Sequence, residues 1–174
     1  MSPSASVAQL SQELWFALHV RSRHDKLVAA NLRVRGMEAL LPLYRSRRRW
    51  SDRTRVMDLP LFPGYVFCRF DPQMLLPILM TPGVVRVISA GKRPCPVAEE
   101  EISAIQRVIC SGNAVEPWPY LRAGQKVRIL DGPLFGIEGI LLDVKNRRRL
   151  VVSVHLLQRS IAVELDRDCI GPPR

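Results

Sequence analysis

The stretch Leu61-Phe62-Pro63-Gly64-Tyr65-Val66-Phe67-Cys68-Arg69-Phe70 (residues 61–70) decides the fold of the first part of the chain. Adjacent proline and glycine mark a turn, and the residues that follow are aromatic or β-branched, which is typical of a strand. A second stretch, Trp15-Phe16-Ala17-Leu18-His19-Val20, has apolar side chains on both faces. That pattern predicts a central strand that other elements cover on both sides.

Helical and extended segments alternate around these two strands. Helices are expected over 25–35, where Gly36 follows as a C-terminal cap, over 72–80, and over 98–110, which opens with three glutamates. Pro77 is expected to kink or shorten the middle helix. Extended segments are expected over 43–44 and 84–88, and a charged hairpin over 45–59. The order β-α-β-β-β-α-β-α predicts an α+β domain, an antiparallel sheet flanked by helices, ending near residue 111.

The remaining segments differ in character from this domain. Residues 1–12 are polar and predict a disordered tail. Residues 112–121 contain two prolines and no helical period, which indicates a linker. From 122 to 174, strands expected over 126–130, 140–144, 150–154 and 161–165 are separated by short turns. Closely spaced strands of this kind predict a small all-β barrel.

The composition is that of a globular protein with a strong excess of positive charge. Of the 174 residues, 47% are apolar and 24% are charged, which excludes wholesale disorder. The net charge of +10 and the pI near 10.3 favour nucleic acid as a partner. No apolar run approaches the roughly 20 residues of a membrane span, and no signal peptide is expected. Four cysteines without a CxxC pair indicate free thiols in a reducing cytoplasm.

Most of the excess charge lies between residues 21 and 55, where eleven basic residues stand against three acidic ones. Tyr44 and Trp50 lie among the arginines of this segment. Guanidinium groups bind phosphate through a fork of donors, and aromatic rings stack on bases, so this segment predicts a nucleic-acid site. A second cluster sits on a turn of the barrel, and both a solvated surface and a binding surface remain open for it. It consists of Lys145, Arg147, Arg148 and Arg149.

The sequence lacks the arrangements that catalysis or metal binding requires. The glutamates at 99–101 are explained by the start of a helix, and the loop at 132–136 lacks the Lys and Ser/Thr of a phosphate-binding loop. The cysteines and histidines lack the short spacing of zinc ligands. Cys68 is expected to be a buried, inert thiol, and His24 with Asp25 to cap a helix or lie on the surface. We therefore expect no enzyme, no cofactor and no metal.

Several motifs, taken in order, resemble the NusG-type family of transcription elongation factors. In the first part these are Trp15-Phe16-Ala17-Leu18, residues 61–67, Thr81-Pro82-Gly83-Val84-Val85 and Pro96-Val97; in the second part they are residues 124–129, Asp131-Gly132-Pro133, Gly139 and residues 158–165. The resemblance implies an NGN-like domain over 13–111, a linker over 112–121 and an SH3-like KOW β-barrel over 122–174. Residues 43–53 and 145–147 resemble the UpxY-like and RfaH-like antitermination branch, whose members often act on long operons.

The resemblance implies a transcription elongation and antitermination factor that binds RNA polymerase and suppresses pausing or termination. The family grips the clamp helices of the largest polymerase subunit through an apolar depression. The matching positions are Trp15, Phe16, Phe62, Pro63, Gly64 and Tyr65. Core packing is the alternative for Phe62 and Tyr65. The residues expected to contact nontemplate DNA or the upstream duplex are Arg21, Arg23, Arg45, Arg47, Arg48, Arg49 and Arg53.

The first long loop of the KOW barrel contacts Rho or a small-subunit ribosomal protein in the family. The matching residues are Pro133, Leu134, Phe135, Gly136 and Ile137. The barrel of one branch refolds to helices, but the β-branched composition here predicts a constitutive barrel. The alternatives are a ribosome-associated RNA-binding KOW protein, which residues 14–110 argue against, and a nuclease, for which no carboxylate cluster is present. The high like charge favours a monomer. The free thiols favour a cytoplasmic location, and the lack of a long apolar run predicts no membrane partner.

Overall fold

The computed structural model describes residues 12–50, 53–121, 124–144, 147–165 and 170–171. Its first part contains β1 (Leu14–Val20), α1 (Asp25–Val34), β2 (Glu38–Leu40), β3 (Leu43–Trp50), β4 (Arg53–Pro60), β5 (Tyr65–Phe70), a 3-10 turn (Pro72–Met74), α2 (Leu75–Leu79), β6 (Val84–Val87), β7 (Ser89–Ala90), β8 (Arg93–Pro94) and α3 (Glu99–Cys110). Its second part contains β9 (Val115–Trp118), β10 (Gln125–Ile129), β11 (Glu138–Val144), β12 (Arg147–Val154), a 3-10 turn (His155–Leu157), β13 (Arg159–Glu164) and β14 (Ile170–Gly171). Most of the expected N-terminal tail, residues 1–11, lies outside the described residues.

A four-stranded antiparallel sheet in the order β2-β5-β1-β6 forms the centre of the first part. Side chains alternate between the two faces of a strand. Phe16, Leu18 and Val20 of β1 therefore pack with α1 and α2, whereas Trp15 and Ala17 pack with α3 and the second part of the chain. The prediction that β1 is a central strand covered on both sides is confirmed.

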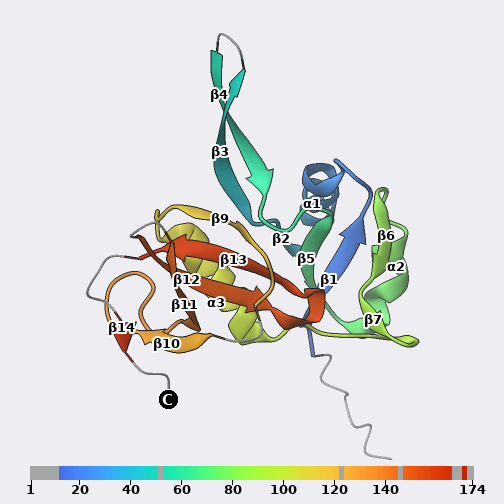
Figure 1. Ribbon diagram of the computed structural model, residues 1–174. Helices are drawn as coiled ribbons and strands as arrows, with labels where there is room; N and C mark the ends of the chain where they lie inside the picture. Colours follow the sequence, from blue (N-terminus) through green and yellow to red (C-terminus); the bar gives the residue numbers. More distant parts are fainter. Residues whose placement is uncertain (1–11, 51–52, 122–123, 145–146, 166–169, 172–174) are drawn as a thin grey trace, which may run out of the picture.

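Strands β3 and β4 form a two-stranded ribbon that projects away from the body of the molecule (Figure 1). We call residues 43–50 and 53–60 the Arg ribbon. Eight residue pairs run from Leu43 opposite Pro60 to Trp50 opposite Arg53, which confirms the expected charged hairpin. Tyr44 packs against the core at the base of the ribbon, so it is not the exposed stacking ring that the sequence suggested.

The second part is an antiparallel sheet, the C-terminal sheet, in the order β14-β10-β11-β12-β13-β9. The prediction of strands rather than helices in this segment is confirmed. Strand β9 lies inside the expected linker and pairs with β13, where Pro117 stands opposite Ile161. Proline is tolerated in an edge strand because it has no N–H group to donate to a second neighbour. The prolines therefore indicated a linker where the fold has an edge strand.

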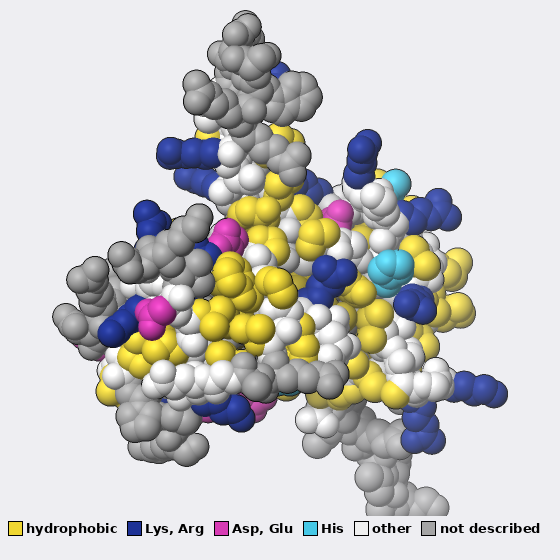
Figure 2. Space-filling model, viewed as in Figure 1, with side chains coloured by type: hydrophobic (Ala, Val, Ile, Leu, Met, Phe, Trp, Pro, Cys, Tyr) yellow, Lys and Arg dark blue, Asp and Glu magenta, His cyan; other side chains and the backbone are white. Residues whose placement is uncertain are grey.

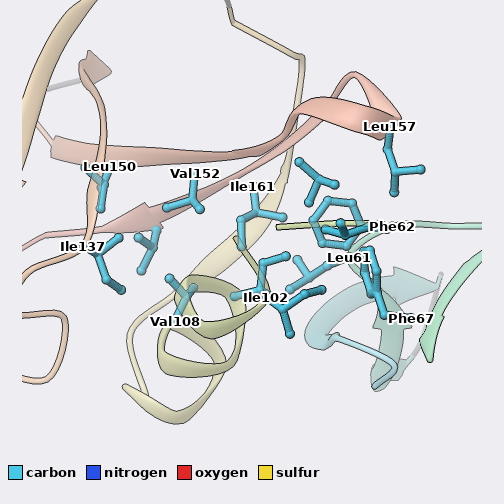
Figure 3. Close-up of a cluster of buried hydrophobic side chains, with 14 of the residues drawn as sticks. Leu61, Phe62, Phe67, Ile102, Val108, Ile137, Leu150, Val152, Leu157 and Ile161 are labelled. Atoms are coloured by element: carbon cyan, nitrogen blue, oxygen red, sulfur yellow. The ribbon is translucent and has the colours of Figure 1, made fainter. Parts of the chain in front are cut away.

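The largest apolar cluster, the shared core, joins the two parts of the chain (Figure 3). The first part supplies Trp15, Ala17, Leu61, Phe62, Phe67, Val97, Ile102, Ile105 and Val108; the second supplies Val127, Ile129, Leu134, Ile137, Leu150, Val152, Val154, Leu157, Ile161 and Val163. Helix α3 lies between the two sheets and contributes to this core with its apolar face, as its periodicity predicts. One face of the first sheet is thus closed by α3 and the C-terminal sheet together.

Candidate functional site

The aromatic turn, residues 61–65, connects β4 to β5, and two other elements fix its conformation. Gly64 has a φ of +83°, in the left-handed region that favours glycine. Its amide donates a hydrogen bond of 2.8 Å to Oδ1 of Asp25, the first residue of α1. Its carbonyl accepts a bond of 2.9 Å from the amide of Val20 at the end of β1. Both polar groups of Gly64 are therefore held by the scaffold.

The aromatic side chains at this turn are covered rather than exposed. Phe62 is 1% exposed and packs edge-on against Phe67, with the ring centroids 5.5 Å apart. Trp15 is 2% exposed, and its indole N–H donates to Oε1 of Glu99 over 3.3 Å. Tyr65 is half-buried. Of the two alternatives for Phe62, the structure therefore shows core packing, because the shared core includes its ring.

Phe16 lies on the opposite face of the first sheet from these residues. It packs against Phe70, with the ring centroids 4.6 Å apart, in the cluster beneath α1. Adjacent residues of a strand point to opposite faces, so Phe16 and Trp15 cannot contribute to one surface. We therefore remove Phe16 from the candidate site. Pro63 is exposed at the tip of the turn.

The C-terminal sheet covers the aromatic turn with the segment that joins β12 to β13 (Figure 3). Leu157 and Ile161 belong to the same cluster as Phe62. The Arg159 guanidinium lies over the Tyr65 ring, 5.6 Å from its centroid, in a cation–π contact. The sequence gives no local signal for this contact, because Tyr65 and Arg159 are far apart in the chain.

Polar contacts from α3 also hold the C-terminal sheet against the first part of the chain. The backbone amide of His155, at the start of the 3-10 turn, donates to Oε1 of Glu101 over 3.2 Å, and Nδ1 of its ring hydrogen-bonds to the same oxygen. Arg107 donates to the carbonyl of Pro133 over 3.4 Å and to the carbonyl of Phe135. A cleft of ≈ 750 Å³ remains between α3 and the C-terminal sheet, lined in part by Lys126. The packing of the C-terminal sheet against α3 is therefore incomplete.

The loop expected to bind Rho or a ribosomal protein is partly exposed. Phe135 is 57% exposed and Pro133 is exposed, as an anchoring loop requires. Leu134 and Ile137 are 3% and 4% exposed and belong to the shared core. Gly136 has a φ of +80° and its amide donates to the carbonyl of Ile129, which turns Phe135 outward.

Basic side chains flank the Arg ribbon below its tip (Figure 2). Arg45, Arg47 and Arg55 are exposed, as are Arg21 and Arg23 in the connection between β1 and α1. The side chains of Arg48, Arg49 and Arg53, which the sequence also assigned to the nucleic-acid site, lie outside the described part. Among the described side chains of the ribbon, the three exposed arginines stand against Asp58, which lies opposite Arg45, so the ribbon carries a net positive charge.

The second basic cluster is largely neutralised by carboxylates. Arg149 is paired with Glu116 of β9 and with Glu164 of β13, and its guanidinium lies over the Trp118 ring at 5.3 Å. Arg147 is paired with Glu164 over 2.8 Å. The pair with Glu116 fastens the edge strand β9 to the sheet and the pairs with Glu164 join β12 to β13, which favours a structural role for this cluster. Its first member, Lys145, lies outside the described residues.

Among the described residues, no group of three or more His, Cys, Asp or Glu side chains is arranged to hold a metal ion. Likewise, no helix in that part of the chain is long and apolar enough to cross a bilayer. Cys68 is fully buried, and burial raises the pKa of its thiol to about 12, with smaller contributions from Glu38 and Glu13. It is therefore a poor nucleophile, as expected. Cys110 is an exposed free thiol, and Cys169 is outside the described residues.

Asp25 is the residue of this site that the sequence did not reveal. The expectation that it caps a helix or lies on the surface is wrong, because Asp25 is 7% exposed and its carboxylate accepts a hydrogen bond from the Gly64 amide. A carboxylate in the first turn of a helix is usually explained by the helix dipole, so its position carried no distinct signal.

The family model described as "Transcription termination factor nusG" matches residues 13–106. The chain belongs to the NusG family. It is 29% identical over 166 residues to the transcription termination/antitermination protein NusG of Pseudomonas aeruginosa, covering 87% of this chain and 94% of that protein. It is 31% identical over 119 residues to NusG of Helicobacter pylori strain J99, covering 66% and 67%.

A solved structure described as "Domain interaction in Thermotoga maritima NusG" has the same fold, with a TM-score of 0.59 at 20% identity over 94% of this chain and 98% of that chain. Proteins of the NusG family are transcription factors without enzymatic activity and act with RNA polymerase. The prediction that this chain is not an enzyme is confirmed by its family. The match over 13–106 also covers most of residues 14–110, the segment that argued against a ribosomal KOW protein.

Proposed function

We propose that this member of the NusG family is a transcription elongation and antitermination factor that binds the clamp helices of the largest RNA polymerase subunit through the aromatic turn. Phe62 and Tyr65 are its anchors, and Trp15 and Gly64 support them. Binding at this position would hold the clamp closed and suppress pausing or termination, and the factor itself performs no chemistry. The C-terminal sheet is proposed to be a KOW barrel and the chain a monomer of the specialised paralogue branch.

One observation supports the proposal: the aromatic turn is an apolar surface, held in place by the scaffold, against which the C-terminal sheet of the same chain packs. Two hydrogen bonds fix its backbone, one that the Gly64 amide donates to Asp25 and one that the Gly64 carbonyl accepts from Val20, so little conformational entropy is lost on docking. Aromatic anchors in fixed positions dominate interface energy, at about 2 kcal/mol or more each. A helical clamp would replace the apolar contacts that Leu157 and Ile161 now supply.

The closed arrangement has a direct consequence for this function. The polymerase and the C-terminal sheet would compete for one surface, so the sheet must move away before the turn can dock. The affinity of the free protein for polymerase is then reduced by the fraction of molecules that are open. Separation would also release Arg107 from the loop that presents Phe135, the proposed anchor for Rho or a ribosomal protein.

The test uses Tyr65, because it contributes to the surface without being fully buried. Tyr65→Ala should weaken binding to purified core polymerase by about tenfold or more, the loss of one anchor. Tyr44→Phe, at the base of the ribbon, serves as a control that alters a tyrosine outside the turn. Binding of Tyr65→Ala at the unchanged affinity, with pausing equally suppressed in transcription reactions, would show that the turn is not the docking site.

A further inference from the structure

Strand β9 is held to the C-terminal sheet by its backbone and by its side chains. All four of its residues pair with β13, beside which the strand lies in Figure 1. Glu116 forms an ion pair with Arg149 of β12, and the Arg149 guanidinium lies over the Trp118 ring. Trp118 also packs against the apolar cluster of that sheet around Ile140. The strand is therefore a part of the C-terminal sheet and not a free connection.

The residues between α3 and β9 are anchored in two groups. Ser111 belongs to the end of α3, because both its amide and its hydroxyl donate to the carbonyl of Val108, over 3.4 and 2.7 Å. Asn113 belongs to the sheet, because its side-chain amide donates to the carbonyl of Glu164 in β13 over 3.0 Å. The carbonyl of the next residue accepts from the Glu164 amide over 2.9 Å. Only Gly112 lies between the two groups.

Gly112 has the properties of a pivot. Its φ is +76°, in the left-handed region, and no described atom beyond its chain neighbours lies within 4 Å of the place that a Cβ would take. A hydrogen bond of 3.2 Å from the Asn113 amide to the Ser111 hydroxyl spans it. Hinges are a few residues at the ends of elements that absorb a change in φ and ψ. Rotation about the bonds of Gly112 would leave the anchors on both sides intact.

We propose that β9 and the rest of the C-terminal sheet move as one body, and that this body swings about Gly112 when the closed form opens. The inference rests on the proposed function and deepens it, because it names the joint through which the aromatic turn is uncovered. The bond between the Asn113 amide and the Ser111 hydroxyl breaks as the body turns, whereas the bonds of β9 to β13 persist.

A pivot at Gly112 keeps the C-terminal sheet beside the end of α3 in the open form. A free linker over residues 112–121 would let the two parts of the chain separate by up to about 33 Å, at roughly 3.3 Å per residue. That reach is lost when the sheet holds β9. The sheet then stays at a high effective concentration next to the aromatic turn, which favours closure whenever the turn is free. A partner bound at Phe135 would likewise be held close to the docked first part.

The first test cuts the folded full-length chain at a specific protease site, inserted either directly after Gly112 or directly after Tyr120. Contacts through the shared core hold the two halves together after either cut, but β9 also holds them after the second. We expect a dissociation constant of the halves at least tenfold lower after the second cut. E116A should raise that constant about two- to fivefold and leave the constant after the first cut unchanged, because Glu116 and Arg149 then lie on the same half. Equal constants after the two cuts would overturn the proposal.

The second test locates the pivot with pairs of spin labels in the uncut chain, the other accessible cysteines being replaced by serine. One pair joins Cys110, at the end of α3, to P117C in β9, and the other joins K26C in α1 to P117C; all three positions are exposed. Leu157→Lys places a charge in the shared core and opens the molecule, and Leu157→Ser replaces it if circular dichroism shows lost strands. We expect the K26C–P117C distance distribution to broaden in this variant while the Cys110–P117C distribution stays narrow. Broadening of both distributions, or of neither, would overturn the proposal. No polymerase is present in either test, so failure here leaves docking through Tyr65 to be judged separately.

Discussion

Leu157→Ala should increase the affinity of the full-length protein for RNA polymerase. Leu157 is 9% exposed and packs in the shared core with the aromatic turn, at the rim of the C-terminal sheet. Truncating a buried leucine costs 2–5 kcal/mol, and we take about 2 kcal/mol for a rim position. Because this loss falls on the closed form, the equilibrium shifts toward the open form by roughly 30-fold. The apparent dissociation constant should fall by up to that factor.

Ile140→Ala provides the matched control for this experiment. Ile140 is 8% exposed and loses the same number of carbons, but it packs with Val151 and Ala162 on the face of the C-terminal sheet away from the aromatic turn. It should lower the stability of the sheet in open and closed forms alike and leave polymerase affinity unchanged. Binding is measured by titrating labelled protein with core polymerase, and circular dichroism checks that both variants keep their strands. Equal or weaker binding of Leu157→Ala would refute the competition between sheet and polymerase.

Three further outcomes follow from contacts elsewhere in the molecule. Asp25→Ala leaves a buried amide of the aromatic turn without its acceptor and should cost about 1–3 kcal/mol in thermal unfolding, with Asp25→Asn closer to the original protein; equal stability of the two variants would contradict the role of the bond. Gly83→Ala should lower the melting temperature more than Gly91→Ala. Both glycines have a positive φ, but a Cβ at Gly83 would lie 2.7 Å from a Val side chain of α1, whereas Gly91 has open space around it. A larger loss for Gly91→Ala would refute the steric argument. A thiol reagent at pH 8 should modify Cys110 rapidly and Cys68 only upon unfolding, and rapid modification of both thiols in folded protein would be inconsistent with the burial of Cys68. Because the pKa of Cys68 is raised in the folded protein, its contribution to the free energy of unfolding should be constant below pH 9 and decline as the pH rises from 9 toward about 12.

Local sequence patterns predict the helices and strands of this fold well, because the spacing of apolar residues within one element sets its pattern. The apolar residues on both faces of β1 and the apolar periodicity of α3 reflect alternation and helical spacing, which need no knowledge of the partner element. The assignment of Phe16 to the same surface as Trp15 could also have been avoided, since neighbours in a strand never share a face.

Local sequence patterns could not predict that the aromatic turn is buried. The cover over Phe62 comes from residues almost a hundred positions away, and an aromatic residue in a turn has the same local pattern whether a second sheet covers it or not. The edge strand β9 was concealed for another reason: Pro117 signals a linker, yet its missing N–H is harmless at the edge of a sheet. In both cases tertiary context decided between two locally equivalent outcomes.

The most direct measurement is a photo-crosslinking experiment with a benzophenone amino acid placed at Tyr65. In the free protein we expect crosslinks to the C-terminal sheet around Arg159, where the ring now lies. In a stalled elongation complex we expect these to be replaced by crosslinks to the clamp helices of the largest polymerase subunit. Crosslinks that stay within the chain once the complex has formed, or that reach polymerase only at another subunit, would contradict the account.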